Sequence, residues 1–528
     1  MFCAMSKTIK LISRTRCKTK FDYRLHQSQS YRYRCRSTFV VEKYENVTGY
    51  EEAKPFEEIP GPKGLPYIGT LLQYRKGPFN RFNVDIFQDA LMSRFKEYGP
   101  IMKETIGGVT AVRLFDPDFV RTVYQYEGKI PYVAPLLDTT KQYREQRNLS
   151  PGLGNTNGDE WYRLRSAVQQ MMMRPKEVTV YLPLVEEVVN DFIKHIKNIK
   201  NKNDEIHDFR REAAKWNLES SGMTCFETRL GCLLPNTEDH LLKMIHYNDE
   251  IFALSAKLQV SLPIHKLFTT PLWRKLVFAE DYFFGNGQKL VDETINKIKD
   301  LEKSGKLQDG DYNFLTYLIS RPELSYKDVS IITLSLFGDG LNTTVPTLLF
   351  TMFCLAKCPR AQEKAYQEIS QFLPHKGEIT PEIINKLVYL KACVKEAARF
   401  MPIGLDIKRI PQKNLVVGGY QVPAGTIVEF CNFVLFKSPD HFVDPEEFLP
   451  ERWLRDGSAH NIHPYLLTPF GHGPRMCAGR RFAEQELYVL LGRMLQNFKI
   501  EWHGKDMTQK YQVLMVPDKP ATFTFVDR

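Results

Sequence analysis

The stretch Phe470–Leu487, FGHGPRMCAGRRFAEQEL, constrains this chain more than any other part of its sequence. Its single cysteine, Cys477, follows a loop with glycines at 471 and 473 and precedes a run of helical character. A cysteine at a helix N-terminus faces backbone N–H groups and the positive end of the helix dipole, which favour the thiolate. Such a thiolate can bind a metal. From the residues alone, a buried structural cysteine in a glycine-rich turn is the alternative.

The neighbours of Cys477 add to the first interpretation. Gly473 and Gly479 allow the backbone to approach a flat macrocycle, Phe470 can shield the sulfur from water, and Arg475 can pair with a carboxylate. The pattern FxxGxRxCxG resembles the haem loop of the cytochrome P450 family, and the resemblance covers roughly residue 55 to the end of the chain. It implies the cytochrome P450 fold, a single large domain that is mainly α with a small β portion. It also implies heme b, iron protoporphyrin IX, with the Cys477 thiolate as axial ligand.

Two further motifs follow in the order that this family has. KEAAR places Glu396 and Arg399 at i and i+3 on one helix face, and PERW supplies Arg452. The resemblance implies that these three residues form a buried structural cluster that braces the haem loop. WYRLR places Trp161 and Arg165 one helical turn apart, and the resemblance directs both at a haem propionate.

Two more arginines, Arg409 and Arg475, are expected to add to the grip on the propionates. The planar guanidinium group suits this role because it pairs bidentately with carboxylates. Without the resemblance, the ExxR pair would be an ordinary surface ion pair and the WxxxR residues would belong to an amphipathic surface.

The third motif, FGDGLNTTVP at Phe337–Pro346, lies within the apolar stretch Ile331–Ala356. We expect a buried helix with a distorted backbone, because Pro346 has no N–H to donate to the carbonyl of Asn342. By resemblance, Thr343 matches the threonine that takes part in oxygen activation. The family usually has an acid immediately before this threonine, but this chain has Asn342.

Asp339 is predicted to compensate in part for the acid that is missing at Asn342. Asp339 and Thr343 are spaced i, i+4, so their side chains could reach each other. Asp339 would then relay protons, or it would form a hydrogen bond to a polar group of the substrate. The alternative is that Asp339 turns into a hydrated pocket and does neither.

The resemblance implies a monooxygenase that inserts one oxygen atom of O2 into an apolar organic substrate, such as a steroid, a sterol or another lipophilic compound. LKACVKEAAR resembles the mitochondrial class, which receives electrons from a small acidic [2Fe-2S] ferredoxin that an NADPH-dependent ferredoxin reductase reduces. Two rivals remain open. One is a microsomal-type enzyme fed by a diflavin reductase, and the other is a non-catalytic haem-thiolate ligand-binding protein.

A ferredoxin docking face is predicted from Lys391 and Lys395. They are spaced i, i+4, about a quarter turn from Glu396 on the same helix, so one face can brace the core while another offers two positive charges. Arg480 and Arg481, just after Cys477, extend this face. An ordinary solvated lysine face is the alternative.

The N-terminus carries nearly all of the net charge of +10, because residues 1–36 contain ten Lys or Arg and one acid. Residues 1–42 read as a mitochondrial transit peptide, 43–58 as a polar linker and 59–528 as the haem-thiolate monooxygenase domain. A disordered basic tail is the alternative. The nearly neutral body predicts no nucleic-acid partner. The expected location is the mitochondrion, on the matrix side of the inner membrane.

The remaining segments predict local structure. Helical periodicity is clear over Leu184–Lys200 and Ala361–Leu373. The expected strands are Ala111–Phe115, Leu415–Val422 and Thr426–Phe436.

Leu258–Trp273 is apolar but broken by prolines, which predicts monotopic membrane attachment. A packed lid over the substrate pocket is the alternative for this segment. The residues expected to enter the membrane are Leu262, Ile264, Leu267, Phe268 and Trp273.

Overall fold

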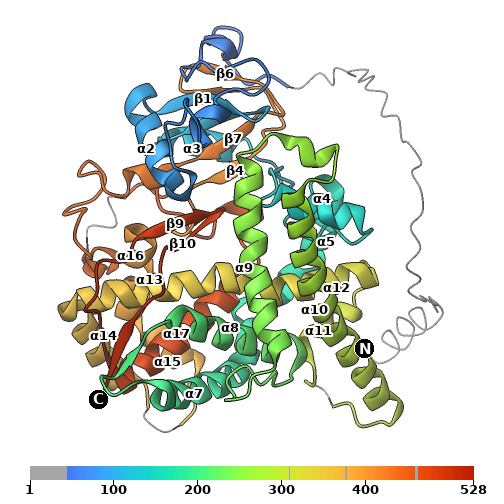
Figure 1. Ribbon diagram of the computed structural model, residues 1–528, viewed down its shortest axis with the longest axis vertical. Coiled ribbons are helices and arrows are strands. Elements are labelled where there is room, and N and C mark those ends of the chain that lie inside the picture. The colour runs from blue at the N-terminus through green and yellow to red at the C-terminus, as the bar shows by residue number, and fades with distance from the viewer. Residues whose placement is uncertain (1–44, 309, 375–376, 458–461) are drawn as a thin grey trace.

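The computed structural model describes residues 45–308, 310–374, 377–457 and 462–528 (Figure 1). The transit peptide predicted over 1–42 lies outside the described residues. Residues 45–58, which the sequence places in a polar linker, pack on the domain. The backbone N–H of Val47 donates to the carbonyl of Asn414 at 3.0 Å, and Phe56 joins a buried apolar cluster.

Helices form most of the fold, and the periodicity predictions over Leu184–Lys200 and Ala361–Leu373 are confirmed by α7 and α14 with small shifts of their ends. The helices are α2 (Phe87–Tyr98), α3 (Pro117–Gln125), α4 (Asp138–Gln146), α5 (Gly158–Met173), α6 (Pro175–Val178), α7 (Leu182–Ile199), α8 (Phe209–Phe226), α9 (Asp239–Gln259), α10 (Pro271–Lys303), α11 (Asn313–Ile319), α12 (Tyr326–Asp339), α13 (Thr344–Lys357), α14 (Pro359–Phe372), α15 (Pro381–Lys386), α16 (Val388–Phe400) and α17 (Arg480–Asn497).

Small sheets account for the β portion. The largest lies in the upper part of Figure 1 and has the order β1-β2-β7-β4, with β2 and β7 parallel and the other pairs antiparallel. The strands are β1 (Ile101–Ile106), β2 (Val109–Leu114), β3 (Glu205–Ile206), β4 (Ile407–Arg409), β5 (Leu415–Val417), β6 (Tyr420–Val422), β7 (Ile427–Phe430), β8 (Phe498–Glu501), β9 (Gln509–Gln512), β10 (Leu514–Pro517) and β11 (Phe523–Asp527).

Two predicted strands need correction. Leu415–Val422 is a hairpin of β5 and β6 that turns at Gly418 and Gly419, and not one strand. Thr426–Phe436 is too long. Strand β7 ends at Phe430, where its pairing with both Leu114 and Ile407 ends, and Asn432–Leu435 forms a 3-10 turn. The backbone N–H of Cys431 still donates to the carbonyl of Leu114 at 2.8 Å, and the 3-10 turn then ends the pairing with the sheet.

The long apolar helix is broken where the sequence predicted distortion. Helix α12 ends at Asp339, a 3-10 turn spans Gly340–Asn342, and α13 begins at Thr344. Thr343 at the break has φ −126° and ψ −62°, outside helical values. Pro346 supplies no N–H in the first turn of α13, which is consistent with the expected cause.

Two glycines let other helices approach this break. A Cβ added to Gly338 would lie 2.4 Å from the ring of Phe283 on α10, and one added to Gly340 would lie 2.6 Å from Asn217 on α8. These contacts leave no room for a side chain. The break is therefore clamped between α8 and α10.

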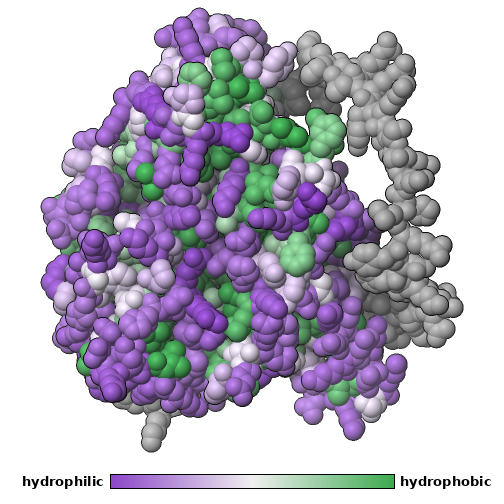
Figure 2. Space-filling view, viewed as in Figure 1, coloured by the Kyte–Doolittle hydropathy of each residue, from purple (hydrophilic) through white to green (hydrophobic). Residues whose placement is uncertain are grey.

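The connection between α9 and α10 carries exposed apolar side chains. Ile264, Leu267 and Phe268 are 48%, 80% and 69% exposed, and Leu262 is half-buried. Figure 2 shows apolar side chains gathered in the upper part of the molecule, where Figure 1 has the turn between these helices. Among the described helices, none alone is long and apolar enough to span a bilayer; only a pair bent by 109° passes, α12–α13 with α14.

Trp273 does not belong to this exposed group, and its predicted membrane contact is wrong. It is 3% exposed and stacks on the ring of His265 with the centroids 5.4 Å apart. Trp273 lies in the first turn of α10, where the helical period turns it towards a cluster with Leu276 and Leu258.

Candidate active site

The Cys477 loop ends directly at the start of α17. Gly471 and Gly473 have φ of +73° and +70°, values that favour glycine, and they turn the loop before the cysteine. The backbone N–H of Cys477 donates to the carbonyl of Phe470 at 2.8 Å. Gly479 is the N-cap of α17. The thiol is therefore presented at a helix N-terminus, as the sequence predicted.

Cys477 is the exposed cysteine of the described residues, yet protein surrounds it. This combination fits a side chain whose accessible surface faces a space inside the molecule and not the outer surface. Burial raises the pKa of the thiol, whereas the backbone N–H groups of Gly479 and Arg480 and the charge of Arg165 lower it. The net shift is upward, so the helix terminus alone does not outweigh burial. A bound metal ion would reverse this balance, because a coordinating thiol is deprotonated.

Asp339 faces the same interior space. The Asp339 side chain is accessible although protein surrounds it. Its negative charge contributes to the raised pKa of Cys477. Burial raises the pKa of Asp339 to about 6, while the positive charge of Arg144 on α4 lowers it. An accessible, protein-enclosed carboxyl at this place is able to exchange protons near neutral pH.

The Thr343 side chain does not contact the Asp339 carboxylate, as the spacing had suggested it could. The Thr343 hydroxyl donates to the main-chain carbonyl of Asp339 at 2.8 Å, so the i, i+4 contact is made to backbone and not to the carboxylate. Asn342 is 1% exposed, and its amide donates to Asn248 on α9 at 2.6 Å. The 3-10 turn causes this difference, because it rotates Asn342 relative to a continuous α-helix.

Glu396, Arg399 and Arg452 lie together, with all three side chains fully buried. Glu396 accepts from Arg399 at 2.7 Å, from Arg452 at 3.1 Å and from the Trp453 indole at 2.8 Å. The arginines also donate to the carbonyls of residues 436, 443, 444, 445 and 447. The cluster therefore fixes the backbone of residues 436–447, which precede the cysteine loop.

The four residues expected at the propionates converge from three elements. Trp161 and Arg165 on α5 are 2% and 5% exposed, and Arg409 at the end of β4 is 4% exposed. The Arg475 guanidinium lies 4.3 Å from the centre of the Trp161 ring. It also donates to the carbonyls of Pro131 at 2.9 Å and Leu153 at 3.3 Å, so much of its hydrogen-bonding capacity ties the loop to its surroundings.

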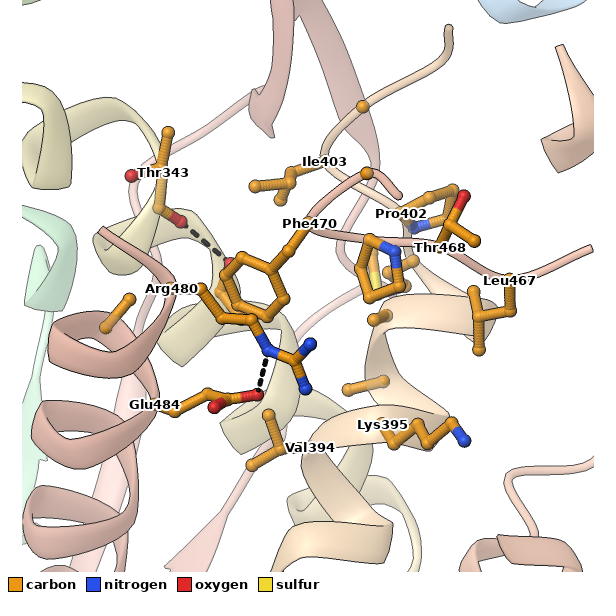
Figure 3. Close-up of a pocket in the computed structure, with 18 of the residues that line it drawn as sticks. Thr343, Val394, Lys395, Pro402, Ile403, Leu467, Thr468, Phe470, Arg480 and Glu484 are labelled. Atoms are coloured by element: carbon orange, nitrogen blue, oxygen red, sulfur yellow. Dashed lines mark hydrogen bonds and ion pairs between the residues drawn. The ribbon is translucent and has the colours of Figure 1, made fainter. Parts of the chain in front are cut away.

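Three of the predicted docking residues, Lys391, Lys395 and Arg480, line a cavity of about 640 Å³ next to the cysteine loop. Figure 3 shows Phe470 between the α12–α13 break at Thr343 and the Arg480–Glu484 pair, with Lys395 on the same cavity. Lys391 is half-buried and Lys395 exposed. Burial lowers the pKa of both amines.

Glu484 offsets part of the positive charge at this cavity. Arg480 and Arg481 pair with it at 2.8 and 3.1 Å. The two lysines are therefore the stronger part of the predicted basic face, because neither amine forms an ion pair within the described residues.

Sequence reasoning missed Glu127 and Arg144. Glu127 pairs with Arg409 beside the cysteine loop, and Arg144 lies within electrostatic range of Asp339 and Glu280. Their partners are far away along the chain, and neither residue stands in a recognisable motif. No local signal in the sequence marks them.

Comparisons with known proteins agree with this geometry. The Cytochrome P450 family model matches residues 59–525. The chain is 41% identical to "Probable cytochrome P450 CYP44" of Caenorhabditis elegans, over 89% of this chain and 94% of that protein. It is 33% identical to "Cytochrome P450 10" of Lymnaea stagnalis, over 91% and 87%. It is 29% identical to "1,25-dihydroxyvitamin D(3) 24-hydroxylase, mitochondrial" of Mus musculus, over 90% of each chain.

These matches span almost the whole described part of the chain. Such an extent of similarity goes beyond a shared fold. The chain belongs to the cytochrome P450 family of haem-thiolate monooxygenases.

Proposed function

We propose that this protein is a mitochondrial, ferredoxin-dependent monooxygenase that inserts one oxygen atom of O2 into a lipophilic, sterol-like substrate. The observation that carries the proposal is that Lys391 and Lys395 line the same cavity as Phe470 of the cysteine loop. An acidic electron donor bound there would lie close to the metal site. The mouse 24-hydroxylase and "Cytochrome P450 302a1, mitochondrial" of Drosophila melanogaster bear mitochondrial names, which supports the location and the donor.

Reconstitution tests the choice of donor. Purified protein is supplied either with ferredoxin and its reductase or with a diflavin reductase, and product formation from a panel of sterols is measured. We expect turnover only with the ferredoxin pair. Turnover with the diflavin reductase, together with a tagged chain located in the endoplasmic reticulum, would overturn the proposal.

The residues at the site suit heme b. The accessible Cys477 sulfur fits a thiolate ligand, and the guanidinium groups of buried Arg165 and Arg409 and of half-buried Arg475 fit a cofactor with carboxylates. Trp161, Phe470 and Gly479 would complete its surroundings. When bound, the haem supplies the redox chemistry that activates O2, and thiolate ligation favours cleavage of the O–O bond.

Proton delivery is assigned to Asp339 with Thr343, and Asn342 is left with a structural role at α9. We expect Asp339→Ala to lower product per electron by about 100-fold or more and to increase peroxide release, because a positioned proton donor contributes at least that much. Product, peroxide and electron consumption are measured together, with substrate affinity from the Soret shift.

Asn342→Asp in the Asp339→Ala background is the matched control. Since the Asn342 side chain lies against Asn248, a carboxylate placed there should not restore coupling. Restored coupling would show that position 342 reaches the oxygen site. Weaker substrate binding with unchanged coupling would instead make Asp339 a substrate contact.

A charge reversal of the two lysines tests the docking face. We expect Lys391→Glu/Lys395→Glu to weaken ferredoxin binding by about 10- to 100-fold at low salt, since like charges at an interface cost several kcal/mol. The loss should shrink as salt screens the charges. Affinity is measured by titration of the oxidised proteins, and substrate binding should not change.

Lys299→Glu/Lys303→Glu near the end of α10 is the control, with the same i, i+4 spacing. It removes as much charge at another place and should bind ferredoxin as the parent does. An equal loss of ferredoxin affinity in both double variants would mean that only the net charge of the protein matters and that Lys391 and Lys395 are not a docking face.

Membrane attachment is proposed through Ile264, Leu267 and Phe268 of the α9–α10 turn. We expect Leu267→Ser/Phe268→Ser to weaken binding to vesicles by about 3 kcal/mol, the value of burying two such side chains. Flotation with liposomes is the measurement. Leu234→Ser, at a residue that is 61% exposed in another loop, should float as the parent does. Unchanged flotation of the double variant would remove the membrane role.

A further inference from the structure

Three positively charged side chains converge next to the Cys477 loop. Arg165 comes from α5, Arg409 from the end of β4 and Arg475 from the loop itself. The Arg475 guanidinium lies 4.3 Å from the centre of the Trp161 ring, which stands one helical turn before Arg165 on α5. Arg409 donates to the carbonyl of His472, three residues before Arg475 in the same loop. The three guanidinium groups are therefore gathered beside one loop, where like charges repel one another in a medium that screens them poorly.

Glu127, two residues beyond the end of α3, counters this repulsion. Its carboxylate pairs with the Nε of Arg409, and the two side chains are 10% and 5% exposed. Burial raises the pKa of Glu127 above its ordinary value, and the positive charges of Arg409 and Arg475 oppose this shift. A Cβ added to Gly473 of the cysteine loop would lie 3.9 Å from the Glu127 carboxylate, which places this acid beside the loop.

The contacts around this pair hold Arg409 in one orientation. Its guanidinium lies 5.3 Å from the centre of the Tyr124 ring on α3 and donates to the carbonyl of His472 at 3.2 Å. The His472 ring packs on Tyr124 with centroids 5.0 Å apart. Burial and the charge of Arg409 lower the pKa of His472.

The charged groups of this cluster have a net charge of two positive units. Three guanidinium groups carry three positive charges and Glu127 carries one negative charge, so two positive charges are left. Heme b, the cofactor of this family, has two propionates. We infer that Glu127 is a positioning residue that fixes Arg409 and sets the charge of the arginine cluster to match the two cofactor carboxylates.

A charge at this place should act on the reduction potential of the haem. Reduction adds negative charge, so removal of a nearby carboxylate favours the reduced state and shifts the midpoint potential to a more positive value. Glu127→Gln is the sharpest change, because it keeps the shape and an oxygen acceptor for Arg409 but removes the charge. The effect should persist at high salt, since buried charges are screened much less than exposed ones.

The experiment is a spectroelectrochemical titration of the haem-loaded full chain at low and high ionic strength. We expect a positive shift in Glu127→Gln, a value near the parent in Glu127→Asp, and a negative shift in Arg409→Gln. The double variant Glu127→Gln/Arg409→Gln should return towards the parent, because it restores the charge balance. Glu501→Gln, in a surface group with Lys499 and His503, removes a similar charge elsewhere and should shift little.

An unchanged potential in Glu127→Gln, or a shift no larger than that of Glu501→Gln, would overturn the inference. Equal shifts in Glu127→Gln and Glu127→Asp would also overturn it, because Asp keeps the negative charge and Gln does not. If Glu127→Gln fails to retain haem, its fold is checked by circular dichroism and haem retention is compared with Glu127→Asp. If Glu127→Asp retains haem and Glu127→Gln does not, the charge role is supported. If both variants lose haem equally, the charge role is contradicted.

Discussion

In the Cys477→Ala protein, we expect the reduced carbon monoxide complex to lack the red-shifted Soret band of thiolate ligation completely. The other described cysteines are buried, apart from Cys358, which is half-buried on the far end of α13. Cys358 is the N-cap of α14, where its thiol donates to the carbonyl of Phe448 at 3.9 Å. No other described cysteine lies in the loop before α17, so none can replace the lost ligand. The measurement is the difference spectrum of the reduced protein with and without carbon monoxide.

Two further variants make this test specific. Cys358→Ala removes a partly accessible thiol away from the site and should keep the parent spectrum. Cys477→His should still bind haem, through its imidazole, but without the thiolate band. A thiolate spectrum in Cys477→Ala would refute the assignment of the ligand. Circular dichroism of each variant separates loss of the ligand from loss of the fold.

The second large effect is expected in stability, from Glu396→Ala. This change leaves Arg399 and Arg452 fully buried without their shared carboxylate. Breaking a buried ion pair by removing one partner costs about 3–5 kcal/mol, because an uncompensated charge stays in the interior. We expect the free energy of unfolding to fall by about that amount, measured by urea denaturation of the haem-loaded protein.

Glu363→Ala is the matched control, since it also removes a glutamate from an ion pair with arginine. Glu363 lies 3.6 Å from Arg528 and is 51% exposed, so its pair is worth only about 0–1 kcal/mol. Similar losses in the two variants would mean that the Glu396 cluster contributes no more than a surface pair.

Several parts of this protein follow from the sequence because their cause is local. The glycines before Cys477 and the helix after it determine how the thiol is presented, and both lie within one short stretch. The i, i+3 spacing places Glu396 and Arg399 together on α16. The break at Thr343 follows in the same way from the neighbouring glycines and Pro346.

Other parts were decided only by the tertiary structure. The direction of Asn342 depends on a 3-10 turn and on Asn248, which another helix supplies. Trp273 is buried because α4, α9 and α10 meet around it, although its sequence neighbours are exposed. Glu127 meets Arg409 only after α3 and β4 have packed in the same part of the fold. Local sequence sets backbone conformation and side-chain spacing, whereas the pairing of distant charges and the burial of a side chain require the packed chain, because both depend on residues that the sequence alone does not bring together.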